Sequence, residues 1–216
     1  MIIDFVNQKG GTGKSTIAFK VAHIMKKQGV KVCLLDLDKQ QTCRRNRERG
    51  FGEFDVFSPG IDGKNKTFEI SQESVYELIN DKKDKYDIIL MDMAGAFDEV
   101  TISALQQVDL AIVPFQVSPN DIPTTVTFVK YLEKIEEIRE RPFKKIALLP
   151  NRIKSGSNDL KNLMQFKPIL EIKEKHYMFE SYITDLQIHK NYTSNLDTVT
   201  EDFGNFVREL IKLIKS

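Results

Sequence analysis

Residues 8–16 of this chain read Gln-Lys-Gly-Gly-Thr-Gly-Lys-Ser-Thr. An apolar run at residues 2–6 leads straight into this stretch, and beyond it Ile17, Val21 and Ile24 recur at helix spacing. A glycine-rich bend between a strand and a helix points several backbone N–H groups at one spot, where the positive end of the helix dipole also lies. The stretch therefore predicts a loop that binds phosphate groups.

The pattern gives two side chains of this loop a chemical role. Lys14 is expected to reach the β- and γ-phosphates of a nucleotide, and the Ser15 hydroxyl is expected to ligate Mg²⁺. The ordinary motif has a glycine five positions before Gly13, where this chain has Gln8, so the loop is a deviant form. The predicted nucleotide-binding residues of the loop are Gly10, Gly11, Thr12, Gly13, Lys14, Ser15 and Thr16.

The rest of the chain alternates short apolar runs with longer amphipathic stretches. Several runs are apolar at consecutive positions, which indicates strands buried on both faces, as in a parallel sheet covered by helices. The pattern predicts an α/β fold with a doubly wound, mostly parallel sheet and helices on both of its faces. The predicted strands are residues 2–6, 30–37, 87–93, 110–115 and 146–150.

Helical patterns separate these runs. One begins near Asp121 and ends before Pro142, since a proline disfavours helix at the residue before it. A second lies within residues 160–175, where Pro168 is expected to break or bend it. The last spans about residues 200–214 and places its apolar side chains on one face.

Composition limits the class of protein. A formal net charge of +1 gives no global field toward nucleic acid or membrane, so any such contact must come from a local patch. The first residues lack a signal-peptide pattern. No apolar run approaches the roughly 20 residues of a membrane-spanning helix. The two cysteines lack the spacing of a metal site and indicate a reduced, cytoplasmic protein. Residues 58–69 are expected to form a mobile loop, and residues 1–216 a single domain, since no linker composition occurs.

Acidic residues follow two of the predicted strands. Asp36 and Asp38 lie at the end of one strand, and Asp92 lies at the end of another. Ligands of open α/β sheets bind beyond the carboxyl ends of the strands, where these carboxylates are expected. They can hold Mg²⁺ and orient a nucleophilic water.

The motifs together resemble the ParA/MinD superfamily of deviant Walker-type P-loop ATPases. Lys9 stands where the extra lysine of that family's phosphate loop stands, and the segment from Asp36 to Gln40 is similar to the family's Asp-x-Asp-Pro-Gln, with Lys39 in place of proline. Residues 92–95 read Asp-Met-Ala-Gly instead of the commoner Asp-Thr-Pro-Pro, which is closer to the short, ParF-like plasmid branch. The resemblance is strong to residue 152 and loose beyond it.

The resemblance implies a set of site residues. Lys9 would reach across a nucleotide-sandwich dimer to the partner's ATP, where a cation supplied in trans stabilises the transferred phosphoryl group. Asp38 would position the attacking water, so the implied catalytic residues are Lys9, Lys14 and Asp38. The implied metal ligands are Ser15, Asp36 and Asp92, and the implied cofactors are ATP and Mg²⁺. Asn151 and Arg152 resemble the family's Asn-Arg segment near the adenine, although a plain strand-end turn explains them too.

The resemblance also implies a function: ATP-dependent dimerisation, non-specific DNA binding and slow hydrolysis that drives plasmid segregation. The implied partners are a second copy, higher-order assemblies, a centromere-binding adaptor of the ParB or ParG kind, and nucleoid DNA, whereas a membrane is not expected. Operator-specific binding is not expected either. The first strand begins at residue 2, so the amino-terminal helical extension of the larger relatives is not expected in this sequence. The rivals are a MinD-like membrane positioning ATPase, a phosphoryl-transfer or amide-ligase enzyme on this scaffold, and a DNA-binding regulator that uses ATP only as a ligand.

Two weaker signals leave alternatives open. Residues 44–49 form a basic cluster that could contact DNA phosphates or be an ordinary solvated helix face. Lys161, Lys167, Lys173 and Lys175 are equally plausible DNA contacts. The last helix could lie on a membrane surface, but packing on the sheet is the more usual use of such a face.

Overall fold

The computed structural model describes residues 1–59, 70–95, 98–139, 141–154, 158–170, 176–185 and 196–216. Within these residues the sheet has eight strands in the order β3-β2-β4-β1-β5-β6-β7, with β8 paired to β6, and every described pair is parallel. The strands are β1 (Ile2–Phe5), β2 (Val32–Leu37), β3 (Asp55–Phe57), β4 (Ile88–Met93), β5 (Leu110–Phe115), β6 (Lys145–Ile153), β7 (His176–Met178) and β8 (Ile183–Thr184).

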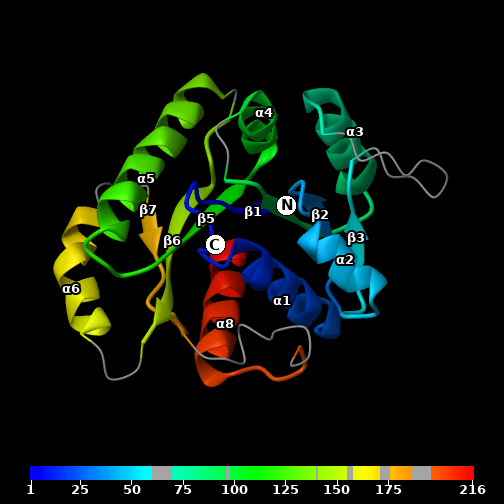
Figure 1. Ribbon diagram of the computed structural model, residues 1–216. Coiled ribbons are helices and arrows are strands. Elements are labelled where there is room, and N and C mark those ends of the chain that lie inside the picture. Colours follow the sequence, from blue (N-terminus) through cyan, green and yellow to red (C-terminus); the bar gives the residue numbers. More distant parts are fainter. Residues whose placement is uncertain (60–69, 96–97, 140, 155–157, 171–175, 186–195) are drawn as a thin grey trace.

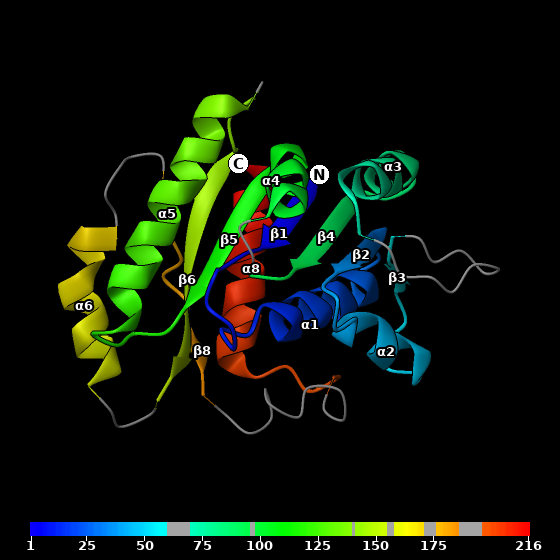
Figure 2. The same cartoon turned by 45° about the horizontal axis from the view of Figure 1, so that its top comes forward.

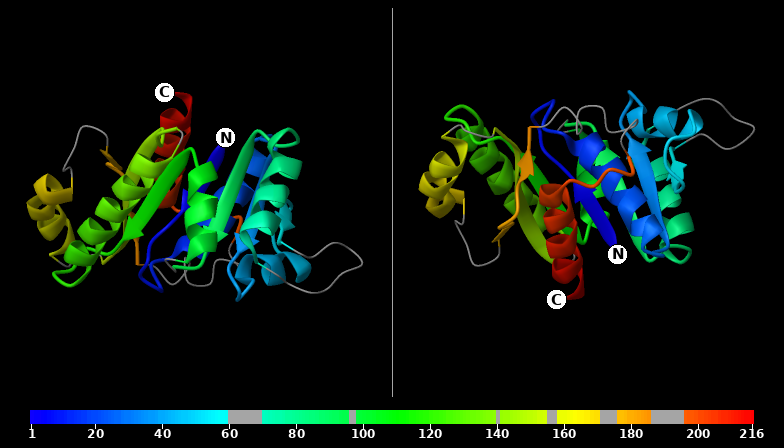
Figure 3. Two further views of the ribbon diagram at one scale, coloured as in Figure 1. Left: turned by 90° about the horizontal axis from the view of Figure 1, so that it is seen from above. Right: turned by 90° about the horizontal axis from the view of Figure 1, so that it is seen from below.

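Helices cover both faces of the sheet (Figures 1 and 2). They are α1 (Lys14–Lys27), α2 (Thr42–Glu48), α3 (Gln72–Lys83), α4 (Glu99–Gln107), α5 (Asp121–Ile138), α6 (Asp159–Leu170) and α8 (Glu201–Lys215). The two views of Figure 3 show α3, α4 and α5 on one face and α1 and α8 on the other. This arrangement confirms the predicted doubly wound α/β fold.

The strands alternate between two apolar layers, which is why they read as continuous apolar runs. Along β4, Ile88 and Leu90 enter the layer under α1 and α8, whereas Ile89 and Met91 enter the layer under α3, α4 and α5. Successive side chains of a strand point to opposite faces, so a strand covered on both sides needs apolar residues at every position. The covering helices thus explain the pattern that predicted the sheet.

The predicted elements are confirmed with shifts at their ends. All five predicted strands form, and β6 continues to Ile153, three residues beyond its predicted end at Pro150. At Pro168, where the sequence predicts a break or a bend, α6 continues to Leu170 without a break. Residues 171–175 of the predicted helical stretch lie outside the described residues. The expected loop at residues 58–69 lies outside the described residues from residue 60 onward.

The last helix packs on the sheet, as the more usual alternative predicted. Phe203, Phe206, Val207 and Leu210 are buried in the layer shared with α1. The buried face also includes Leu213, while Ile214 is only partly buried. No helix among the described residues is long and apolar enough to cross a membrane.

Asp4 is an acidic residue in the middle of the central strand. It is fully buried, and neither carboxylate oxygen has a hydrogen-bond partner in the described part of the chain. Burial raises the pKa of Asp4 well above its usual value, and the nearby Asp92 raises it further. The carboxyl is therefore held neutral in the folded chain at a pH where it ionises in the unfolded chain.

We predict that Asp4→Asn changes the pH dependence of stability. With a folded pKa above the unfolded value near 4, the wild-type chain loses about 1.4 kcal/mol of unfolding free energy per pH unit as pH rises between the two values. The isosteric amide does not titrate, so the variant gains on the wild type at that rate across this window. Urea unfolding at pH 5, 6 and 7 measures the difference. Parallel pH profiles for the two proteins would contradict a neutral Asp4.

Candidate nucleotide-binding site

The predicted phosphate loop forms the bend between β1 and α1. Gly13 precedes α1 with φ 93°, and Gly11 has φ +76°, a left-handed conformation that glycine adopts without a steric cost. The buried amide of Asn151, two residues before the end of β6, donates from Nδ2 to the Thr12 carbonyl at 2.6 Å. A Cβ on Gly13 would lie 2.6 Å from the same Nδ2 atom. Glycine is therefore required where Asn151 fastens the loop to the sheet.

The parallel register gathers the acidic strand ends beside this loop. Asp36 of β2 is the register partner of Asp92 of β4, which in turn pairs with Phe5 at the end of β1. The Ser15 hydroxyl donates to Asp92 Oδ1 at 3.0 Å. The structure thus brings together the three residues predicted as metal ligands, Ser15, Asp36 and Asp92, at the carboxyl edge of the sheet.

Burial makes these carboxylates electrostatically expensive. It raises the pKa of Asp36 to about 7 and that of Asp92 to about 6, and for Asp36 the backbone N–H of Arg44 partly opposes the rise. A cation beside them would relieve this cost, and hydroxyl and carboxylate oxygens are the donors that Mg²⁺ prefers. Within the described residues no three His, Cys, Asp or Glu side chains converge on one metal position. The donor set therefore fits Mg²⁺ only if phosphate oxygens and water complete the shell.

Cys43 is a site residue that sequence reasoning missed. It is fully buried on α2, and its Sγ donates to Asp92 Oδ2 at 3.2 Å. Burial raises the pKa of the thiol well above its usual value, with the charges of Asp92 and Asp36 adding to the rise, so it is a donor and not a thiolate. The polar and basic neighbours of Cys43 in the sequence gave no signal that it packs beside a carboxylate.

Asp38 lies at the rim of this group. Its Oδ1 accepts from the Gln40 backbone N–H at 2.8 Å, and its own N–H donates to Asp36 Oδ1 at 3.3 Å. These bonds shape the turn after β2, in which Gln41 has a left-handed φ of 49°. The water-positioning role of Asp38 stays a prediction.

The two lysines of the loop differ in their surroundings. Lys9 forms an ion pair with Asp121 at the start of α5, and Asp121 also accepts from the Ser118 hydroxyl at 2.7 Å. The side chain of Lys9 is 43% exposed and that of Asp121 is 8% exposed, so the pair lies at the surface with its acid anchored. Lys14 lies close enough to Asp92 to lower the pKa of that carboxyl. In this single chain Lys9 is thus held by its own α5.

A cavity of about 50 Å³ lies beside the loop, and Asn151 is one of the residues that line it. Arg152 lines it with a left-handed φ of 58°, at the register shift where β8 pairs with β6. The structure therefore places both residues predicted near the adenine beside the loop. The residues lining the cavity are Gly13, Thr16, Ile17, Asn151, Arg152, Ile183, Thr184, Asp185 and Phe203.

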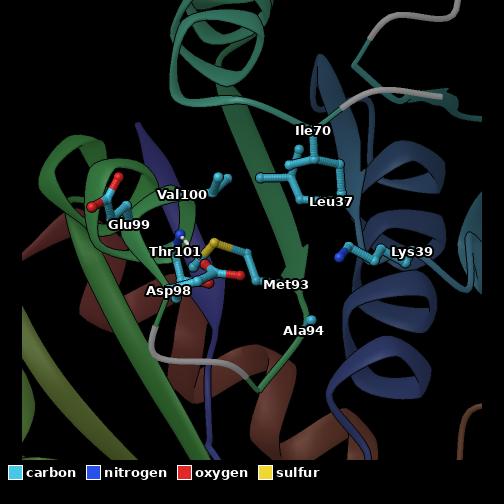
Figure 4. A pocket seen from close by; sticks show the side chains of 9 residues that line it. All are labelled: Leu37, Lys39, Ile70, Met93, Ala94, Asp98, Glu99, Val100 and Thr101. Atoms are coloured by element: carbon cyan, nitrogen blue, oxygen red, sulfur yellow. Dashed lines mark hydrogen bonds between the residues drawn. The ribbon is translucent and has the colours of Figure 1, made fainter.

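A second hollow, of about 300 Å³, lies beside the ends of β2 and β4 (Figure 4). Its walls include the apolar side chains of Leu37, Met93 and Val100, and Figure 4 shows the Lys39 amine turned toward them. Asp98 lines the hollow and caps α4 by accepting from the Thr101 N–H at 2.8 Å. The hollow touches the segments that follow both acidic strand ends.

Two arginines of the basic cluster at residues 44–49 already bind other groups of the same chain. Arg44 pairs with Glu48 at 2.9 Å, and Arg47 donates to the Phe54 carbonyl at 2.9 Å. Arg45 and Arg49 are exposed. Of the four lysines considered with the cluster, Lys173, Lys175 and the side chain of Lys167 lie outside the described part of the chain. The solvated-face alternative thus describes part of the cluster, and DNA contact stays a prediction.

Comparison with known proteins identifies a family whose sequence pattern this chain matches. A family model described as the CobQ/CobB/MinD/ParA nucleotide binding domain matches residues 3–185. Protein VirC1 of Rhizobium radiobacter is 24% identical over 61% of this chain and 55% of its own length, and the chromosome-partitioning ATPase Soj of Treponema pallidum is 28% identical over 52% and 55%. The chain thus spans about half the length of the curated relatives it matches.

Solved structures share the fold across the whole chain. A putative plasmid partition protein of Borrelia burgdorferi bound to AMPPNP is 19% identical, with a TM-score of 0.69 over 99% of this chain and 97% of that one. The McdA(D38A)–ATP complex of Cyanothece is 13% identical with a TM-score of 0.74, covering 99% and 96%. Cobyrinic acid a,c-diamide synthase of Mycobacterium smegmatis with ADP and magnesium is 14% identical with a TM-score of 0.73, covering 100% and 96%. At these identities the likeness shows the fold alone.

We predict that Gly13→Ala weakens ATP binding about tenfold or more, because its Cβ displaces the Asn151 amide that holds the loop at the Thr12 carbonyl, and a buried hydrogen bond lost in this way costs about 1–3 kcal/mol. Gly29→Ala is the matched control: Gly29 has φ +82°, and a Cβ added there would meet no atom within 4 Å, so this variant carries the backbone strain without touching the loop. Calorimetric titration with ATP and Mg²⁺ compares the two. Equal affinities in both variants and the wild type would contradict the requirement at Gly13.

Proposed function

This chain belongs to the CobQ/CobB/MinD/ParA nucleotide-binding family, and from that premise we propose that it is a partition ATPase that binds ATP with Mg²⁺ and hydrolyses it slowly. One observation carries the proposal: Lys9, in the phosphate loop, is held by a surface ion pair that a second subunit's nucleotide could replace. Plasmid and chromosome partition proteins among the similar chains support this reading.

The proposed binding mode follows from the loop and the strand ends. Backbone N–H groups of Gly10 to Thr16 and the α1 dipole hold the phosphates, and Lys14 reaches the β- and γ-phosphates. Ser15 and Asp92 hold Mg²⁺, with Asp36 in the metal's surroundings, and the ion supplies charge neutralisation of the phosphates. Asp38 positions the attacking water, and Asn151 and Arg152 flank the base.

The ion pair between Lys9 and Asp121 gives a physical basis for an ATP-driven dimer. Lys9 must leave Asp121 before it can reach a partner's nucleotide, and a surface pair of this kind contributes about 0–1 kcal/mol. A desolvated triphosphate in a dimer interface offers Lys9 a stronger partner. ATP then favours the dimer through contacts that exist only in the dimer.

The proposed DNA binding and the proposed adaptor protein are inferred from the family. In this reading the ATP dimer binds nucleoid DNA without sequence preference and can assemble further, and a ParB- or ParG-like adaptor stimulates hydrolysis. Arg45 on α2 and Arg49 at its end are exposed and available for phosphate contacts. Segregation of a plasmid would be the output.

We predict that Lys9→Ala retains ATP binding but loses the ATP-dependent dimer, because it removes the cation supplied in trans. Asp121→Asn is the matched variant: it removes the acid that holds Lys9 in its own chain, so its dimer should form at lower ATP concentration. Light scattering with ATP and Mg²⁺ reports both. A Lys9→Ala dimer that forms as in the wild type sinks the proposed role of Lys9.

A second candidate is an amide-forming or phosphoryl-transfer enzyme. The hollow of about 300 Å³ beside the acidic strand ends offers space for an acceptor, and the fold is shared with a diamide synthase. Phosphate release that depends on an added small-molecule acid, and not on DNA with an adaptor, would favour this enzyme over the partition ATPase.

A further inference from the structure

The short strand β8 forms one wall of the cavity beside Asn151. It contains only Ile183 and Thr184, and its pairing with β6 shifts register around Arg152. Beyond it, the Asp185 N–H donates to the Ile153 carbonyl at 2.9 Å. A two-residue strand at a register shift needs support from elsewhere to keep one position.

That support comes from the first turn of α8. Asp202 Oδ2 accepts from both the backbone N–H and the hydroxyl of Thr184, each at 2.7 Å. Bonds to an ionised carboxylate are stronger than neutral ones, and the charge sits at the positive end of the helix dipole. Asp202 is therefore well placed to hold β8, one wall of the cavity, in a fixed position.

A second carboxylate of α8 holds the chain that leads into β8. Glu209 accepts from the Tyr177 hydroxyl at 2.6 Å, the Glu180 N–H at 2.9 Å and the Ser181 N–H at 3.0 Å. Residues seven apart lie on one face of a helix. Asp202 and Glu209 therefore accept hydrogen bonds from the segment between β7 and β8 at two separate points. The position of this segment is thus tied to that of α8.

The same helix touches the phosphate end of the site. Phe203 lines the cavity, and the buried Lys20 of α1 lies 4.8 Å from the centroid of its ring. Because α1 begins at the phosphate loop, α8 connects the loop's helix to the β8 wall. Thr184 lines the cavity of about 50 Å³ together with Gly13 and Asn151, so the position of the β8 wall sets how much room a base has beside the loop.

We propose that Asp202 is a positioning residue for the nucleotide base, acting through Thr184. The proposal rests on the nucleotide site proposed above and adds a role for the last helix: α8 sets where the β8 wall stops against the base. It predicts that α8 contributes to the affinity for the base and not to the affinity for the phosphates.

The test compares ATP with inorganic tripolyphosphate, which lacks the base and the sugar, by calorimetry in the presence of Mg²⁺. Asp202→Ala should lower the affinity for ATP about tenfold and leave that for tripolyphosphate unchanged, since a charged hydrogen bond that positions the wall is lost. Asp202→Asn retains one acceptor oxygen and should recover part of the affinity. Glu201→Ala removes the adjacent exposed carboxylate and should match the wild type.

Other outcomes separate the ideas. Unchanged ATP affinity in Asp202→Ala, or an equal loss for ATP and tripolyphosphate, overturns the positioning role while the nucleotide site stands. A wild-type chain that binds neither compound overturns the proposed function and this inference with it. If Asp202→Ala does not fold, Thr184→Val, which removes only the hydroxyl bond, should still lower ATP affinity relative to tripolyphosphate, and no change there overturns the inference.

Discussion

The parallel register of β2, β4 and β1 is the constraint on which the site depends. It sets Asp36 opposite Asp92, and Asp92 opposite the residue that ends β1, so the phosphate loop emerges beside two buried carboxylates. A shift of one residue would turn these side chains to the other face of the sheet. The apolar layers on both faces fix the register, and the chemistry at the edge follows from packing far from it.

Charge balance explains why the edge is suited to a ligand. Asp36 and Asp92 are buried with raised pKa values, because desolvation outweighs the Arg44 N–H that opposes it at Asp36 and the Ser15 hydroxyl that opposes it at Asp92. Lys9 is engaged with Asp121 and not with these carboxylates. The carboxylates are therefore undercompensated where they are most costly, while the backbone of the loop and the α1 dipole attract anions beside them. A magnesium–triphosphate complex supplies both the cation and the anion together.

Much of the fold and of the site could be predicted from the sequence, because the features involved depend on residues that are neighbours in the chain. The loop at residues 8–16, the acidic strand ends and the five central strands each have a signature in neighbouring residues. The strands β3, β7 and β8 have at most three residues and no periodicity to detect. The roles of Cys43, Asp121 and Asp202 depend on partners 49, 112 and 18 residues away, which no local pattern reveals. Helix α6 passes Pro168, which shows that a proline signal is not decisive inside a helix.

The central claim is that the bend between β1 and α1 holds the triphosphate through Lys14 with Mg²⁺ at Ser15 and Asp92. Calorimetric titration of the wild-type chain and Lys14→Ala with ATP, each with Mg²⁺ and with a chelator, tests it most directly. The account predicts saturable binding that weakens when Mg²⁺ is removed and disappears in Lys14→Ala. ATP binding of equal affinity in the two proteins, indifferent to Mg²⁺, would contradict it.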